Sequence, residues 1–123
     1  MPLRTGALKL KLQLMSGDRI AFGPGKADLL EAIDNEGSIS GAGRALGMSY
    51  RRAWLLVDEM NHCFADKLVE TLTGGGRDRG ARMTEAGRAI LVAYRELEAA
   101  AGQVADMPTY RALIGRLLDA PAD

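Results

Sequence analysis

Apolar residues recur at helical spacing between residues 49 and 64, and the rest of the chain is interpreted around this stretch. They fall on one face at about 3.6-residue spacing: Ala53, Leu56, Val57, Met60 and Phe64. Ser49 stands just before the stretch, where its hydroxyl can accept a hydrogen bond from a free backbone N–H of the first turn. The pattern predicts an amphipathic helix that begins after Ser49 and buries one side.

The other side of this predicted helix is led by guanidinium groups at its N-terminal end. Arg51 and Leu55 point away from the apolar stripe, Tyr50 and Trp54 lie on one shoulder, and Arg52 lies on the other. The N-terminal end of a helix carries free N–H groups and positive dipole charge, which suit a phosphate. One exposed leucine is ordinary, but on a DNA-reading face Leu55 could contact a thymine methyl group.

A shorter helix is expected directly before this one, within residues 37–47. Ser40 is interpreted as its N-cap, and Gly47 suits a left-handed C-cap. A short helix, a glycine-containing turn and a longer helix together predict a helix-turn-helix. The alternative is an ordinary pair of packed helices.

Strand patterns lie on both sides of this unit. Leucines alternate with polar residues over residues 8–14, which predicts a half-buried strand, and residues 19–22 can return beside it as an N-terminal β-hairpin. Residues 26–36 predict a helix with Gly37 as its C-cap. Residues 68–72 and 81–83 predict two further strands, and Arg77 and Arg79 in the loop between them suit a phosphate backbone or minor groove.

The last third of the chain predicts helices with apolar stripes. From Thr84 to about residue 105, apolar positions alternate by four and three in a heptad-like seam: Ala86, Ile90, Ala93, Leu97, Ala100 and Val104. A second stripe follows: Tyr110, Leu113, Ile114, Leu117 and Leu118. We therefore expect a DNA-binding domain over residues 1–105 and an amphipathic dimerisation appendage over residues 106–123, the alternative being a terminal helix that folds back on a monomer.

These elements predict an α+β, mainly α fold: a winged helix-turn-helix with an N-terminal β-hairpin, a two-stranded wing and C-terminal dimerisation helices. A length of 123 residues and 47% apolar content suit one domain with a substantial core. The formal net charge is zero, so no global field attracts nucleic acid, and only the local arginine clusters do.

The chemistry-bearing residues suggest no enzyme. Cys63 is the sole cysteine, which excludes an intrachain disulfide and a cysteine-based zinc site. His62 and Cys63 are interpreted as structural or solvated, and the adjacent acids Asp58 and Glu59 point about 100° apart, in a solvated or helix-pairing role. No catalytic constellation, metal site or cofactor is expected. With no apolar run of membrane length and no signal-peptide pattern, we expect no membrane partner and place the protein in the cytoplasm.

Several motif strings carry a family resemblance that extends over about residues 8–97: GSIS at 37–40, GMSYRRAW at 47–54, DEMN at 58–61, LVET at 68–71 and TGGG at 73–76. They strongly resemble the N-terminal domain of the ModE family of molybdate-responsive transcription regulators. The resemblance implies a LysR-like winged helix-turn-helix that binds palindromic operator DNA as a homodimer. Only a short helix is expected after residue 105, so the family's oxyanion-binding residues have no counterpart, and we expect no molybdate binding by this chain.

The sequence therefore predicts a sequence-specific DNA-binding regulator whose partner is double-stranded DNA. The candidate DNA-binding residues are Ser40, Ser49, Tyr50, Arg51, Arg52, Trp54, Leu55, Arg77 and Arg79. Two other functions stay open: a protein-interaction adaptor on the same scaffold, which zero net charge favours, and an oxyanion sensor with a site at the dimer interface.

Overall fold

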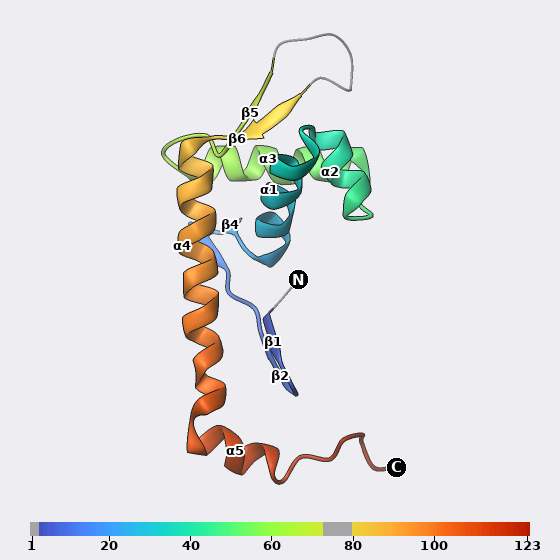
Figure 1. Cartoon of the computed structure of the whole chain (residues 1–123), viewed down its shortest axis with the longest axis vertical. Coiled ribbons are helices and arrows are strands. Elements are labelled where there is room, and N and C mark those ends of the chain that lie inside the picture. The colour runs from blue at the N-terminus through green and yellow to red at the C-terminus, as the bar shows by residue number, and fades with distance from the viewer. Residues whose placement is uncertain (1–2, 73–79) are drawn as a thin grey trace.

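The computed structural model describes residues 3–72 and 80–123 and shows a small helical unit from which one long helix extends (Figure 1). The elements in chain order are β1 (Leu3–Thr5), β2 (Leu8–Leu10), β3 (Leu14–Ser16), β4 (Arg19–Phe22), α1 (Pro24–Glu36), α2 (Ile39–Ala45), α3 (Tyr50–Cys63), β5 (Val69–Thr71), β6 (Ala81–Met83), α4 (Glu85–Gly102), the 3₁₀ helix η1 (Gln103–Asp106) and α5 (Pro108–Ile114). The expected fold class is confirmed: the chain is mainly helical, with small antiparallel strand pairs.

The hydrophobic core lies where α1, α2, α3 and the part of α4 up to Tyr94 meet. Leu29, Leu30 and Ile33 of α1 and Met60 of α3 are fully buried there. The Phe22 ring at the end of β4 meets the rings of Phe64 and Tyr94 edge-on, with centroid distances of 6.1 and 5.0 Å. Such edge-to-face pairs add to the burial of apolar area.

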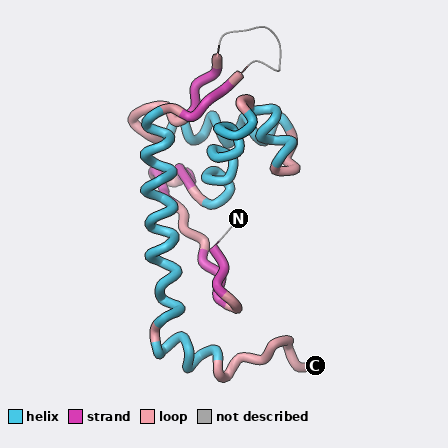
Figure 2. The backbone as a smooth tube through the Cα atoms, in the orientation of Figure 1, coloured by secondary structure: helices cyan, strands magenta, loops and turns pink. Residues whose placement is uncertain are grey.

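The predicted N-terminal hairpin with its return strand at residues 19–22 is confirmed, but the continuous strand expected over residues 8–14 is wrong, because the segment forms two short hairpins. β1 pairs with β2 through a turn at Gly6, and β3 pairs with β4 through a turn at Gly17; both glycines have positive φ, 59° and 58°. The alternating leucines break between these hairpins at Leu12, whose carbonyl accepts a hydrogen bond from the Tyr94 hydroxyl at 2.9 Å. The segment between the hairpins is therefore loop (Figure 2), and a tertiary partner on α4 replaces the expected strand partner.

The helix-turn-helix is confirmed, with one correction to its first cap. Ser38, not Ser40, caps α2: its hydroxyl accepts from the Gly41 N–H at 2.9 Å. Ser40 is the second residue of α2 and is buried. Gly37 ends α1 in a left-handed conformation and the extended Ser38 follows directly, so α2 begins at Ile39, before the position expected from a Ser40 cap. Ser49 caps α3 as predicted, accepting from the Arg52 N–H at 3.1 Å.

The predicted strand pair after α3 is present and forms a wing. β5 and β6 are antiparallel, with Val69 opposite Met83 and Thr71 opposite Ala81. Arg77 and Arg79, expected at the tip of the wing, lie outside the described residues.

The last third of the chain forms the predicted long helix, with one correction at its end. The face of α4 that packs on the core carries Gly87, Leu91, Tyr94 and Glu98, whereas the heptad-like seam is half-buried at Ala86 and Ile90 and exposed from Ala93 onward. The large Tyr94 side chain and the ion pairs of its neighbours set the rotation of the helix, which an alanine-rich seam does not. In addition, α5 ends at Ile114, so Leu117 and Leu118 lie beyond the helix.

Candidate nucleic-acid interface

The outward side of α3 presents the residues that the sequence analysis singled out. Ala53, Val57 and Met60 are buried against the core, while Arg51, Arg52 and Leu55 are exposed. The exposed Ser49 side chain caps the N-terminal end of α3. α2 packs beside α3 (Figure 1). Guanidinium groups therefore stand at the positive end of a rigid helix, which is an arrangement that attracts an anionic backbone.

Arg51 lies beside an apolar hollow on this face. The hollow has a volume of about 410 Å³, and its lining residues are Tyr50, Arg51, Trp54, Leu55 and Asp58. The Tyr50 and Trp54 rings meet edge-on, with their centroids 6.2 Å apart and an interplanar angle of 71°. Trp54 also packs against the core, so it gives the hollow a fixed wall.

Arg52 faces a different, more polar hollow of about 310 Å³, shared with Lys11 and the N-terminal end of α1. Beneath it Lys26 is only 5% exposed and pairs with Glu59 of α3, while also donating to the Ile20 carbonyl. This pair, buried at Lys26 and half-buried at Glu59, ties α1, α3 and β4 together, and it is the helix-pairing role expected for one of the two adjacent acids. Lys26 itself was missed, because a single lysine inside a helical pattern carries no sign of burial.

Asn61 is a second residue that sequence reasoning missed. Its side-chain oxygen accepts from the backbone N–H groups of Leu68 and Val69 at 2.9 and 3.1 Å, and its amide nitrogen donates to the Val69 carbonyl at 3.0 Å. One side chain on α3 thereby fixes the root of the wing. The signal was the position of an amide on the shoulder of an amphipathic helix.

The wing root is also held from the other side by α4. The Thr84 side chain caps α4 through the Gly87 N–H and donates to the Lys67 carbonyl at 2.6 Å. A Cβ on Gly87 would lie 2.3 Å from the Leu68 carbonyl oxygen, so only glycine allows this approach.

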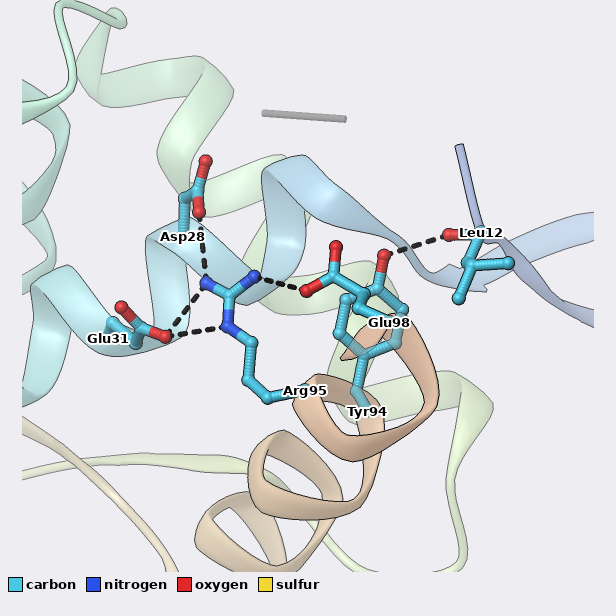
Figure 3. Close-up of polar contacts among 6 residues, drawn as sticks. All are labelled: Leu12, Asp28, Glu31, Tyr94, Arg95 and Glu98. Atoms are coloured by element: carbon cyan, nitrogen blue, oxygen red, sulfur yellow. Dashed lines mark hydrogen bonds and ion pairs between the residues drawn. The ribbon is translucent and has the colours of Figure 1, made fainter. Parts of the chain in front are cut away.

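A charged cluster docks α4 onto α1 (Figure 3). Arg95 of α4 donates to Glu31 and Glu98 at 2.8 Å each and to Asp28 at 3.1 Å. Burial opposes the charge of Arg95, but the hydrogen bonds to Glu98, Glu31 and Asp28 outweigh it and raise the pKa of the guanidinium above its ordinary value. The Arg95 guanidinium therefore stays ionised, and its contacts with α1 fix the direction in which α4 leaves the helical unit.

The residues expected to have no catalytic role are placed as follows. His62 lies one turn from Asp58, with Nδ1 2.7 Å from the Asp58 carbonyl and 3.4 Å from its carboxylate. Across residues 3–72 and 80–123, no group of three or more His, Cys, Asp or Glu side chains is arranged to hold a metal ion. In the same ranges no helix combines the length and apolar character needed to cross a membrane.

A helix-turn-helix followed directly by a two-stranded wing defines the class: a winged helix-turn-helix protein. Residues 26–88 match the family of bacterial regulatory helix-turn-helix proteins of lysR type, and the chain belongs to that family.

Among solved structures, CbnR_DBD in its complex with DNA shares the fold, with a TM-score of 0.54, 22% identity and coverage of 72% of this chain and 94% of that one. Full-length LysG from Corynebacterium glutamicum with bound effector Arg gives a TM-score of 0.50 and 30% identity, over 81% of this chain and 31% of that one.

Curated relatives agree with the resemblance to ModE. The molybdenum-pterin-binding protein MopA of Rhodobacter capsulatus is 42% identical over 91 residues, which are 74% of this chain and 34% of MopA. The molybdenum transport protein ModE of Azotobacter vinelandii is 43% identical over 57% of this chain and 26% of its own length. The dual regulator ModE of Escherichia coli K12 is 37% identical over 71% of this chain and 32% of its own length. The matched part of the chain therefore spans about a third or less of these relatives.

Proposed function

We propose that this chain is the DNA-binding part of a ModE-type transcription regulator, with α3 as the helix that enters the major groove. The observation that carries the proposal is the outward face of α3, where Arg51 stands exposed at the N-terminal end of a helix whose other side is buried. Membership of the lysR family over residues 26–88 supports the same function. A location in the cytoplasm is part of this proposal, because bacterial regulators meet their DNA there.

Each candidate residue then has a role. Arg51 and Arg52 contact phosphates or base edges, and the two hollows that they face let them reach different parts of the groove. Ser49 and Tyr50 set the position of the helix N-terminus.

Ser40 is 8% exposed, so we leave it out of the interface. Arg77 and Arg79 hold the wing on the DNA backbone.

We further propose that the protein binds DNA as a homodimer through the part of the chain farthest from α3. Large apolar residues are exposed in the second half of α4 and in the residues after it: Leu97, Val104, Met107, Leu113, Leu117 and Leu118. A second apolar hollow, of about 400 Å³, lies between Leu12, Leu14 and the Leu97–Ala101 side of α4. Two-fold pairing would bury these surfaces isologously and present two α3 helices to a palindromic site.

Selection of bound sequences from genomic DNA with the purified chain tests both parts of the proposal. Enrichment of a palindrome supports a dimeric DNA-binding protein, and a single short motif supports DNA binding by a monomer. The control is the Arg51→Ala/Arg52→Ala protein, which should enrich nothing while keeping its melting temperature, because exposed charges contribute little to stability. If the native chain also enriches nothing, the proposed function is wrong and the adaptor alternative stands.

A further inference from the structure

The outward face of α3 carries more apolar surface than its fold requires. The core takes Ala53, Val57 and Met60 from this helix, yet Leu55 on the opposite face is 57% exposed and Tyr50 is 38% exposed. These two side chains and Trp54 line the hollow of about 410 Å³ beside Arg51. Tyr50 and Leu55 take no part in the core packing, and apolar side chains that gather on an exposed face mark an interaction site.

The lining of the hollow suits an apolar group better than a phosphate. Trp54 is anchored in the core, and its edge-on contact with Tyr50 holds both rings in place. Asp58 lies in the lining one turn farther along α3, and its carboxylate repels a phosphate at that end. Arg51 at the near end can still reach a phosphate or a guanine edge, so charge and apolar contact are separated along the helix.

We propose that this hollow receives the C5-methyl group of a thymine in the major groove, with Leu55 as the residue that determines the preference. The inference rests on the proposed DNA-binding function of α3. Thymine is the only unmodified base that presents a methyl group in the major groove, and apolar side chains distinguish it by contact. The hollow begins beside Arg51 and continues along the same helix face, so a base contacted by Leu55 lies within a base step or two of the group contacted by Arg51.

The test removes one methyl group at a time from the operator. In DNA selected with the native chain, each thymine is replaced singly by deoxyuridine, which keeps base pairing and the O4 acceptor and deletes only the methyl group. We expect one or two positions in each half-site to lose roughly three- to tenfold in affinity, the effect of removing one buried methyl group. Other thymines should tolerate the change.

The matching protein variants show whether Leu55 makes the contact. In Leu55→Ala, the thymine and deoxyuridine operators should bind equally at the sensitive position. Leu55→Gln, which keeps much of the side-chain volume without its apolar end, should behave in the same way. Val92→Ala provides the control, because Val92 is similarly exposed, at 53%, on a face of α4; this protein should keep the full sensitivity to deoxyuridine.

The outcomes separate this inference from the function on which it rests. If operator binding is specific and depends on Arg51, but no thymine responds to deoxyuridine, the thymine contact is wrong and the DNA-binding function stands. If a thymine responds equally in the native and Leu55 variants, another residue contacts the methyl group and the assignment to Leu55 is wrong. If no operator is enriched, both the function and the contact are wrong.

Discussion

At the scale of single residues, Arg51 and Arg52 show how one position along a helix changes what a charge can contact. Successive helical residues point about 100° apart, so the two guanidinium groups face different hollows, one apolar and one lined by Lys11 and Glu59. Arg51 is the better placed of the two to contact a base, because its hollow lies on the fully outward side of α3.

Replacing Arg51 by alanine should therefore weaken specific binding by about 1–3 kcal/mol if Arg51 contacts a base, with relaxed specificity at that position. If it contacts only phosphate, affinity should fall equally on all sequences and the salt slope should decrease by about one. Salt-dependent binding titrations separate the two cases. Arg116→Ala, on an exposed residue beyond α5, is the control; unchanged operator affinity in a folded Arg51→Ala protein would contradict the assignment.

We expect the Asn61 side chain to contribute more to the free energy of unfolding than a residue on a helix surface usually does, because it makes three hydrogen bonds to the wing root. Asn61→Ala leaves the N–H groups of Leu68 and Val69 and the Val69 carbonyl without this partner, so we expect a loss of about 2–3 kcal/mol in the free energy of unfolding. Asn61→Asp keeps an acceptor for both N–H groups and should lose less. Denaturant titrations measure the order of the three proteins, and an alanine variant as stable as the native chain would show that the wing root needs no side-chain anchor.

At the scale of elements, α4 is held to the helical unit by side chains that the linear pattern does not display. Tyr94 is 1% exposed, and burial, followed by the charge of Glu98, raises the pKa of its phenol from 10.0 to about 12. Its hydroxyl donates to the Leu12 carbonyl, so the same residue orders both the helix and the segment between the two hairpins.

The raised pKa predicts a loss of stability in alkali that depends on Tyr94. The tyrosine of the unfolded chain loses its proton near pH 10, so the contribution of the phenol is complete below that pH and falls as the pH rises toward about 12. The difference in the free energy of unfolding between the native and Tyr94→Phe proteins should shrink by on the order of 2 kcal/mol across this interval. Denaturant titrations from pH 8 upward measure it, and a difference that stays constant to pH 12 would contradict the burial of the phenol.

The contact between α4 and the wing root makes a second prediction for this element. Gly87→Ala adds a Cβ at 2.3 Å from the Leu68 carbonyl oxygen and 2.9 Å from the Met83 side chain, so α4 or the wing must shift. We expect destabilisation of about 1–3 kcal/mol despite the higher helix propensity of alanine. Gly25→Ala in α1, where no atom lies within 4 Å, is the matched control and should leave stability equal or slightly higher. Thermal melts of the two variants decide whether the approach is as close as the structure shows.

At the scale of the whole molecule, the chain is elongated, with α3 and the wing at one end and α5 at the other (Figure 1). α4 packs against the helical unit as far as Glu98, residues 99–102 of α4 are not buried, and α5 holds no buried residue. Many exposed apolar residues thus lie in the end of α4 and in α5, where no other described element of the same chain covers them.

Removing residues 106–123 should consequently weaken the dimer and lower operator affinity, with little effect on the melting of the helix-turn-helix. Leu113 and Leu117, at 68% and 57% exposed, offer a milder change: Leu113→Glu/Leu117→Glu should shift the mass in solution toward the monomer, because charges in a buried apolar interface are costly. Light scattering at micromolar concentration measures the mass. A monomer for the full chain, together with non-cooperative operator binding, would overturn the dimer.

Much of the local structure was determined by the sequence itself. The apolar spacing around Ala53 and Val57, the Ser49 cap and the glycines at 37 and 47 are local signals, and local backbone preferences were enough to place α1, α3 and the wing strands. The order of these elements predicted the winged helix-turn-helix, and the family motifs implied its LysR-like type, which the match to the lysR family over residues 26–88 confirms.

Tertiary structure decided what local preference could not. Periodicity fixes which residues can share a face of α4 but not which face is buried; Tyr94 and the carboxylates around Arg95 made that choice through contacts between residues more than sixty positions apart. The same holds for Leu12, drawn out of a strand by Tyr94, and for Lys26, buried only because Glu59 meets it from another helix. A buried charge or buried hydrogen-bonding group needs a partner, and in these cases the partner is distant in sequence. The residues next to each group in the sequence therefore do not identify its partner.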